Sequence, residues 1–183
     1  TALRTSGVTL FIEDRMIADA GPWLDGDLDT GEAVPFGPPG VRLLPMKSTV
    51  RKMPLVTVLT YGIMRQRVEA VLAPWLAAWD GDYYAEPNLS VDLLDMRSIY
   101  PFDLSSLTNG RFSLGRTGKL LVIEPDVEYG GVGAEIAASI AELIPGVKIK
   151  RLGARRDTIP ARADKHHLYL PTAEEITNAI LSW

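Results

Sequence analysis

The sequence predicts an α/β protein, a three-layer α/β/α sandwich built around a mostly parallel sheet of about five strands. Three observations carry this prediction. Apolar runs of strand length occur, as is typical of strands that are buried on both faces of a parallel sheet. Segments with apolar residues at helical spacing alternate with these runs. In residues 118–144 an apolar strand, a turn with paired glycines and a helix follow one another directly.

The first part of the chain is irregular. A short strand is expected at Val8–Ile12, because this run is rich in strand formers. Residues 19–52 then hold five prolines and five glycines, which prevents a regular helix and leaves room for at most a short strand at Val41–Leu44. A segment of this length without secondary structure is uncommon inside one domain. We therefore expect residues 1–52 and 53–183 to be separate parts of the protein.

The sheet proper begins with a continuous apolar strand at Leu55–Tyr61, which Gly62 ends. The helix that follows carries an apolar stripe and a proline, Pro74, which should kink it or loosen a turn. Ser90–Asp95 is the next expected strand. The stripe of the helix is made of Val68, Val71, Leu72, Trp75, Leu76 and Trp79.

The central unit has a strand at Lys119–Ile123, which we expect to end at Glu124, and a helix at 132–144. A further strand is expected at Val147–Lys150, followed by a basic loop from Arg151 to Arg156. The stripe of this central helix is Val132, Ile136, Ile140, Leu143 and Ile144, with alanines and Gly133 on the flanking faces.

The last helix is predicted from its start signal. Thr172 and Glu175 have the spacing of a capping box, in which each side chain satisfies a backbone amide of the other residue. Ile176, Ile180 and Trp183 then lie on one face. Strands and helices that alternate in this way indicate parallel pairing.

Composition excludes several classes of function. The 183 residues carry a net charge of −4, which gives no electrostatic reason to expect nucleic acid or an anionic membrane as a partner. No cysteine is present, so disulfides, thiolate catalysis and cysteine metal sites are excluded. No apolar run approaches the ~20 residues of a membrane span, and no signal-peptide pattern opens the chain. We expect a cytoplasmic protein; because the chain begins at Thr1, it could be an excised fragment.

Acidic residues follow the central strand, where open α/β sheets form their sites. Glu124, Asp126 and Glu128 could serve as acid or base groups, but a solvated acidic rim is the more common arrangement. The paired glycines Gly130 and Gly131 could bind phosphate at the helix start. Their spacing fits no phosphate-binding motif, so a tight turn with a closely packed helix is the favoured interpretation.

Metal sites are also weakly supported. His166 and His167 are adjacent in sequence, with no third ligand at helical spacing, so a metal site is not expected there. Asp25, Asp27 and Asp29 have the start of a calcium loop, but the glycine and glutamate that should follow are missing. From the chemistry of the residues we assign no catalytic, cofactor-binding or metal-ligating residue.

Several short motifs, taken in order, resemble one family. The motifs at 34–37, 56–62, 95–97, 101–103, 118–124 and 130–135 look like the C-terminal half of a transketolase-like chain. The segments at 151–160 and 170–176 narrow the resemblance to the beta subunit of a thiamine-diphosphate-dependent 2-oxoacid dehydrogenase E1 component, of the pyruvate or branched-chain type. Each motif is weak alone, but together they cover nearly the whole chain.

The resemblance implies a division of the chain and of the chemistry. Residues 1–52 would be the end of the upstream pyrimidine-binding domain and a connecting arm, and residues 53–183 the transketolase C-terminal-like domain. In this family the activating glutamate lies in the upstream domain, and the diphosphate and magnesium sit on the alpha chain. Thiamine diphosphate and Mg²⁺ are therefore expected in the intact complex but not on this chain, which alone should be inactive.

The partners that the resemblance implies are an E1 alpha subunit, an E2 acyltransferase with its lipoyl groups, and a second copy of the chain. Two other assignments stay open. One is the C-terminal domain of a transketolase or a deoxyxylulose-phosphate synthase. The other is an assembly or regulatory domain without catalytic function.

Overall fold

The computed structural model describes residues 41–43, 55–77, 91–96, 99, 114–162, 165 and 168–183. They contain five strands: β1 (Val41–Leu43), β2 (Val56–Thr60), β3 (Val91–Met96), β4 (Lys119–Val127) and β5 (Lys148–Ala154). The helices are α2 (Ile63–Ala77), α4 (Leu114–Thr117), α5 (Val132–Leu143) and α6 (Ala173–Leu181). The predictions for Val8–Ile12, for Asp25–Asp29, for 101–103 and for His166 and His167 lie outside the described residues.

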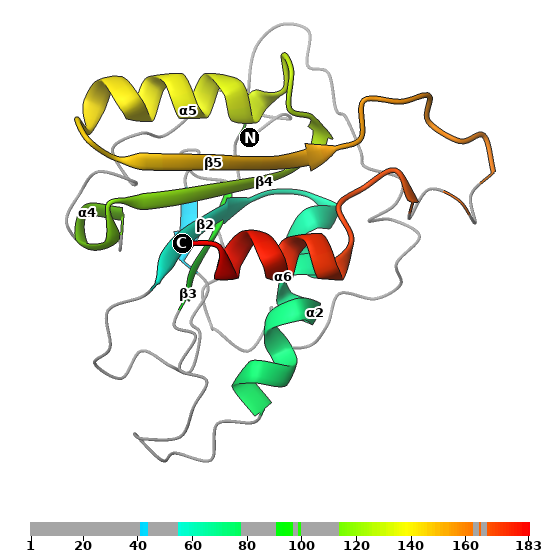
Figure 1. The fold of residues 1–183 in the computed structure, drawn as a ribbon, viewed down its shortest axis with the longest axis horizontal. Helices are drawn as coiled ribbons and strands as arrows, with labels where there is room; N and C mark the ends of the chain where they lie inside the picture. Colours follow the sequence, from blue (N-terminus) through cyan, green and yellow to red (C-terminus); the bar gives the residue numbers. More distant parts are fainter. Residues whose placement is uncertain are drawn as a thin grey trace, which may run out of the picture.

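The strands form one sheet in the order β1-β3-β2-β4-β5. The pairs β2–β3, β2–β4 and β4–β5 are parallel, and only the short β1 runs antiparallel to β3. Helix α5 covers one face of the sheet, and α2 and α6 cover the other (Figure 1). The predicted three-layer sandwich with a mostly parallel, five-stranded sheet is confirmed.

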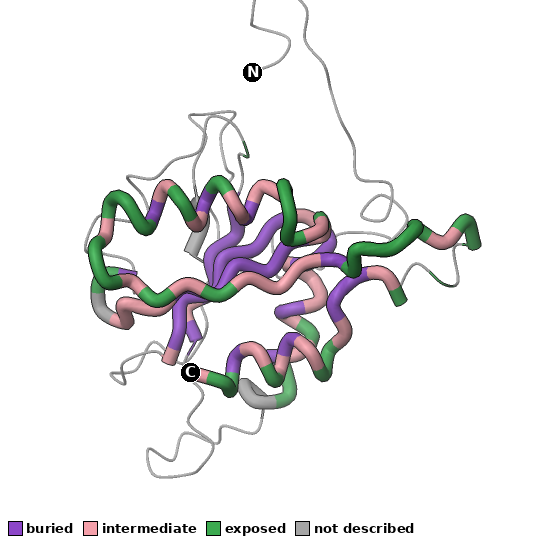
Figure 2. Tube along the Cα trace, turned by 45° about the horizontal axis from the view of Figure 1, so that its top comes forward, coloured by how far each residue is buried: buried purple, intermediate pink, exposed green. Residues whose placement is uncertain are grey.

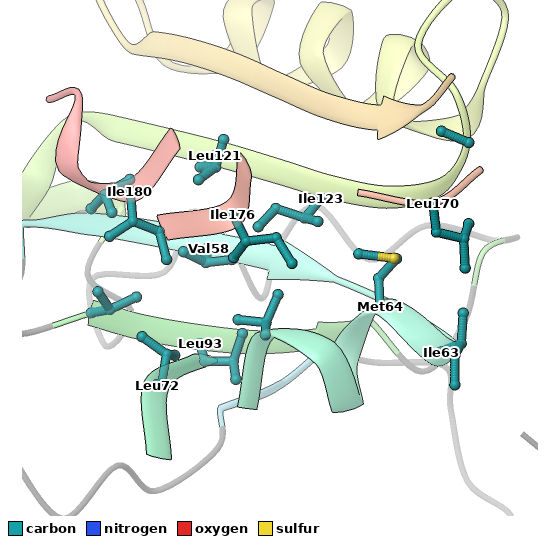
Figure 3. Close-up of a cluster of buried hydrophobic side chains, with 14 residues drawn as sticks. Val58, Ile63, Met64, Leu72, Leu93, Leu121, Ile123, Leu170, Ile176 and Ile180 are labelled. Carbon is teal, nitrogen blue, oxygen red and sulfur yellow. The ribbon is translucent and has the colours of Figure 1, made fainter. Parts of the chain in front are cut away.

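The central strands of the sheet are buried (Figure 2). Alternation along them builds a core on each face of the sheet. On β4, Leu121 and Ile123 point toward α2 and α6, whereas Leu120 and Val122 point toward α5. The cluster on the α2 and α6 side is apolar throughout; Figure 3 shows its members, which include Val58, Met64, Leu72, Leu93, Ile176 and Ile180. The capped last helix with Ile176 and Ile180 on its inner face is confirmed, whereas Trp183 follows the end of the helix and packs against the same core from there.

The order of the strands reverses beside β2. The chain passes from β2 through α2 to β3 on one side, and later occupies the other side with β4 and β5. In open α/β sheets, the carboxyl ends of the strands at such a reversal form a crevice where sites occur. Here these are the carboxyl ends of β2 and β4.

Three sequence-based predictions about the central unit are wrong. β4 does not end at Glu124 but continues to Val127, with a shift of its pairing register between Ile123 and Val127. Because β4 is longer, β5 stays paired with it as far as Ala154, so Arg151–Ala154 is strand rather than loop. Leu143 is 52% exposed, since Ile144 leaves the helical conformation at the end of α5 and packs against the core there.

Two further details were not predicted. Helix α4 is only four residues long, too short to show an apolar period. Gly133 does not lie on a free flank of α5; it is buried against the sheet. Within the described ranges, no helix combines the length and the apolar character that crossing a membrane would need.

Candidate functional site

Tyr61 and Glu124 face each other at the carboxyl ends of β2 and β4. The pairing of Thr60 with Ile123 places Tyr61 opposite Glu124 at the next position. Both side chains lie on the α5 face of the sheet, because Leu59 and Val122, two residues earlier, belong to the core on that face. The fold thus brings together two polar groups that are 63 residues apart in sequence.

Glu124 is fully buried, with 0% of its surface exposed. The backbone N–H of Gly133, in the first turn of α5, donates a 2.7 Å hydrogen bond to Glu124 Oε2. The Tyr61 hydroxyl lies 3.3 Å from the same oxygen. The other oxygen, Oε1, is buried and has no hydrogen-bond partner among the described residues. A carboxylate with this surrounding lacks most of the donors that it has in water.

The balance of these effects raises the pKa of Glu124. Burial is the largest cause, and the nearby Asp126 acts in the same direction. The hydrogen bonds from Gly133 and Tyr61 and the charge of Arg151 lower the pKa, but they do not compensate for the burial. The folded protein therefore favours the neutral form of Glu124 more than water does.

The Tyr61 hydroxyl lies between two carboxyl groups, because it is also 3.0 Å from Asp126 Oδ2. Burial, followed by the charges of Asp126 and Glu124, raises the pKa of Tyr61 far above the physiological range. The hydroxyl therefore keeps its hydrogen and acts only as a hydrogen-bonding group. No signal in the sequence pointed to Tyr61, since it follows an ordinary apolar strand.

The glycines before and within α5 leave space for Glu124 and for the backbone of β4. A Cβ atom on Gly131 would overlap the backbone carbonyl oxygen of Val127 and would also lie 2.8 Å from Glu124 Oε2. One on Gly133 would overlap the Glu124 carboxyl group. Gly130 adopts φ +77°, which favours glycine. The interpretation as a tight turn with close packing is confirmed. The start of α5 is occupied by the protein's own carboxyl group.

The predicted solvated rim is correct for Asp126 and Glu128, which are exposed, and wrong for Glu124. The error follows from the extent of β4: since the strand continues past Glu124, the alternation turns this side chain toward α5. On the opposite face, Arg65 pairs with Glu69 at 3.0 Å and approaches Asp95 at 4.0 Å. In the part of the chain that the structure describes, no group of three potential ligands could hold a metal ion.

Comparison with protein families identifies the fold family. The family described as "Transketolase, C-terminal domain" matches residues 48–176. The chain belongs to this family. A solved structure, "Split gene transketolase, inactive beta4 tetramer", has the same fold with a TM-score of 0.53; it is 21% identical and covers 72% of this chain and 40% of its own.

Curated relatives of the domain are beta subunits of 2-oxoacid dehydrogenases. A pyruvate dehydrogenase E1 component subunit beta from Staphylococcus epidermidis is 31% identical over 124 residues, which cover 66% of this chain and 34% of the relative. The subunit from Rickettsia bellii is 24% identical over 98% of this chain and 49% of its own length. A mitochondrial 2-oxoisovalerate dehydrogenase subunit beta from Chaetomium thermophilum is 37% identical over 48% of this chain and 16% of its own. The resemblance to this group of subunits is confirmed, and the chain spans at most about half the length of these relatives.

Proposed function

We propose that this chain is the C-terminal part of an E1 beta subunit, which takes part in the oxidative decarboxylation of a 2-oxoacid and the transfer of the acyl group to lipoyl groups of an E2 component. The observation that carries the proposal is the match to beta subunits of this type, including one that aligns along 98% of the chain. Names with pyruvate and with 2-oxoisovalerate both occur among the relatives, so the proposal covers the class of 2-oxoacids.

In this proposal residues 53–183 are an assembly domain, and residues 1–52 are the end of an upstream domain and a connecting arm. β1 supports a close connection, because Val41–Leu43 of the arm pairs with β3 of the sheet. Thiamine diphosphate and Mg²⁺ would bind elsewhere in the intact enzyme, which we place in the cytoplasm. Glu124 is not proposed as a catalytic group, since its carboxyl group already binds the start of α5.

The face of α5 that points away from the sheet supports an assembly role. Its exposed positions include the small residues Ala138 and Ala141 and the apolar Leu143. Small side chains let another helix approach closely, which a surface facing water does not require. We propose that this face contacts a second copy of the chain. A specific contact of this kind should bury at least ~1,000 Å² in total.

The test compares the wild-type chain with Ala138→Glu by analytical ultracentrifugation. A charge that enters a dry interface without a partner costs about 3 kcal/mol, so self-association should weaken on the order of a hundredfold. The matched control is Asn178→Glu, which places the same charge on an exposed position of α6 and should leave association unchanged. Thiamine diphosphate with Mg²⁺ should not alter the sedimentation of any sample.

Three results would contradict the proposal. A wild-type chain that stays monomeric at high micromolar concentration would remove the self-contact. Equal association of wild type and Ala138→Glu would move the contact away from α5. Saturable binding of the cofactor to this chain alone would show that it holds a cofactor site, against the proposed division of the enzyme.

A further inference from the structure

The Tyr61 hydroxyl lies close to two carboxyl groups but has a single hydrogen to donate. A tyrosine hydroxyl carries one hydrogen and two lone pairs. Its oxygen lies 3.0 Å from Asp126 Oδ2 and 3.3 Å from Glu124 Oε2, so two carboxyl groups compete for one hydrogen. Asp126 is exposed and has the shorter of the two contacts. The hydrogen of Tyr61 therefore belongs to Asp126, and a lone pair of the hydroxyl faces Glu124.

An ionised Glu124 would be poorly satisfied in this arrangement. It would have the Gly133 N–H as its one full donor, a lone pair of Tyr61 opposite Oε2, and an Oε1 without a partner. Its carboxyl group lies where a Cβ atom of Gly133 would be and close to where one of Gly131 would be, so it is packed directly against the backbone at the start of α5. A neutral Glu124 is better satisfied, because a proton on Oε2 can be donated to the free lone pair of Tyr61 and the Oε1 without a partner then belongs to an uncharged group.

We propose that Glu124 keeps a proton in the folded protein and forms, with Tyr61 and Asp126, a proton-linked latch between the sheet edge and α5. In the closed state the chain of bonds runs from Glu124 to the Tyr61 oxygen and from the Tyr61 hydroxyl to Asp126. When Glu124 loses its proton, the negative charge needs water, and the turn at Gly131–Gly133 must open to admit it. This inference is independent of the proposed function.

The groups that face Glu124 come from each element packed around it. Tyr61 follows β2, Asp126 lies on β4, and Arg151 on β5 is the nearby positive charge. Arg151 donates a hydrogen bond to the backbone carbonyl of Glu128. Helix α5 contributes backbone only, through Gly131 and Gly133. Arg151 and Gly133 favour the charged form of Glu124, whereas Asp126 favours the neutral form. Burial is the largest of these effects, and it also favours the neutral form.

The stability that the latch contributes should fall as the pH rises. The pKa of Glu124 is higher in the folded than in the unfolded chain, so the folded state binds the proton more tightly. The contribution of the latch is fully present below the ordinary glutamate pKa of about 4.3. It falls as the pH rises toward the folded value, and above that value it is lost.

The test measures the midpoint of thermal unfolding, Tm, of the full chain from about pH 4, near the ordinary glutamate pKa, up to about pH 9. Glu124→Gln imitates the neutral acid and cannot ionise. Relative to wild type, its Tm should rise with pH and be higher by roughly 2–5 °C at the alkaline end. Glu135→Gln, at an exposed position of the same helix, is the matched control and should follow the wild-type profile.

Two further variants keep the test decisive if Glu124→Gln does not fold. Tyr61→Phe removes the oxygen that accepts the Glu124 proton in the latch, so the pH transition should move to lower pH. Asp126→Asn removes a negative charge that raises the pKa of Glu124, so the transition should move to lower pH there too. In the wild type, amide hydrogen exchange at Gly133 should accelerate through the same transition. Parallel Tm profiles for wild type and Glu124→Gln, or a transition that does not move to lower pH in Tyr61→Phe and in Asp126→Asn, would overturn the latch.

Discussion

The helices α5 and α6 both begin with a backbone amide that is satisfied by a glutamate, yet the two glutamates come from different levels of structure. At α6, Thr172 is the N-cap and Glu175 returns from the first turn, so the capping box is complete within four residues. At α5, Gly131 is the N-cap and offers no side-chain bond. The Gly133 amide there is satisfied by Glu124, which lies nine residues earlier, on β4.

The environment gives the two carboxyl groups opposite properties. The pKa of Glu175 is lowered, first by the hydrogen bond from the Thr172 backbone, and its side chain is 42% exposed. The pKa of Glu124 is raised, because burial outweighs a similar backbone bond. A backbone N–H at a helix start therefore does not by itself keep a glutamate ionised. The access of water decides which form the fold prefers.

The largest effect should come from filling the space that Glu124 occupies. Gly133→Ala places a Cβ atom against the Glu124 carboxyl group, inside a packed region, and should cost about 2–3 kcal/mol of unfolding free energy. Gly115→Ala is the matched control: a Cβ there meets nothing within 4 Å, so stability should hardly change. Denaturant unfolding measures both.

A double mutant tests whether the cost of Gly133→Ala is due to Glu124. Truncating the acid in Gly133→Ala/Glu124→Ala removes the atoms that the new Cβ would strike. The two substitutions should therefore be strongly non-additive, with the double mutant less destabilised than the sum of the single ones. Additive costs would mean that Gly133 is needed for another reason, such as the path of the backbone.

The difference between the two helix starts also separates what the sequence predicts from what it does not. The Thr172–Glu175 spacing is local and has a fixed geometric meaning, so the cap could be predicted from four letters of sequence. The parallel strands and the apolar stripe at Ile176 and Ile180 follow from periodicity in the same way. Such predictions need only neighbours along the chain.

The site at Glu124 depends on two facts that lie outside its own stretch of sequence. One is that β4 continues to Val127, which directs the side chain inward; the apolar run ends at Ile123 and suggests the opposite. The other is the pairing of β4 with β2, which brings Tyr61 across the sheet. The glycines Gly131 and Gly133 were visible as a signal of close packing, but the group that packs against them was not.

A smaller effect is expected from removing the local cap. Thr172→Ala deletes the side-chain oxygen that accepts from the Glu175 amide and should cost about 1 kcal/mol. Thr177→Ala is the matched control, because Thr177 bonds back to Ala173 inside the same helix and alanine is a better helix former. Chemical denaturation should place this control at or slightly above wild type. A Thr172→Ala chain as stable as wild type would mean that water caps α6 equally well.

The smallest effect should have the opposite pH dependence to that of the latch. The pKa of Glu175 is lowered on folding, so its charge stabilises the protein above the ordinary glutamate pKa, and this contribution is lost as the pH falls through the folded value. Glu175→Gln keeps the capping geometry and removes only the charge. It should lower stability at neutral pH by a few tenths of a kcal/mol, since the exposed side chain is screened by solvent.

The pH profile of Glu175→Gln then gives the sharpest form of the comparison. The loss of unfolding free energy in Glu175→Gln should shrink toward zero below about pH 4. Glu124→Gln should instead be more stable than wild type, and the gain should be seen at high pH. Glu174→Gln, a neighbouring exposed acid in the first turn of α6, serves as the control for a general charge effect at the helix start. If Glu174→Gln and Glu175→Gln gave the same profile, the helix dipole would account for both. The bond from the Thr172 backbone would then have no separate part in lowering the pKa of Glu175.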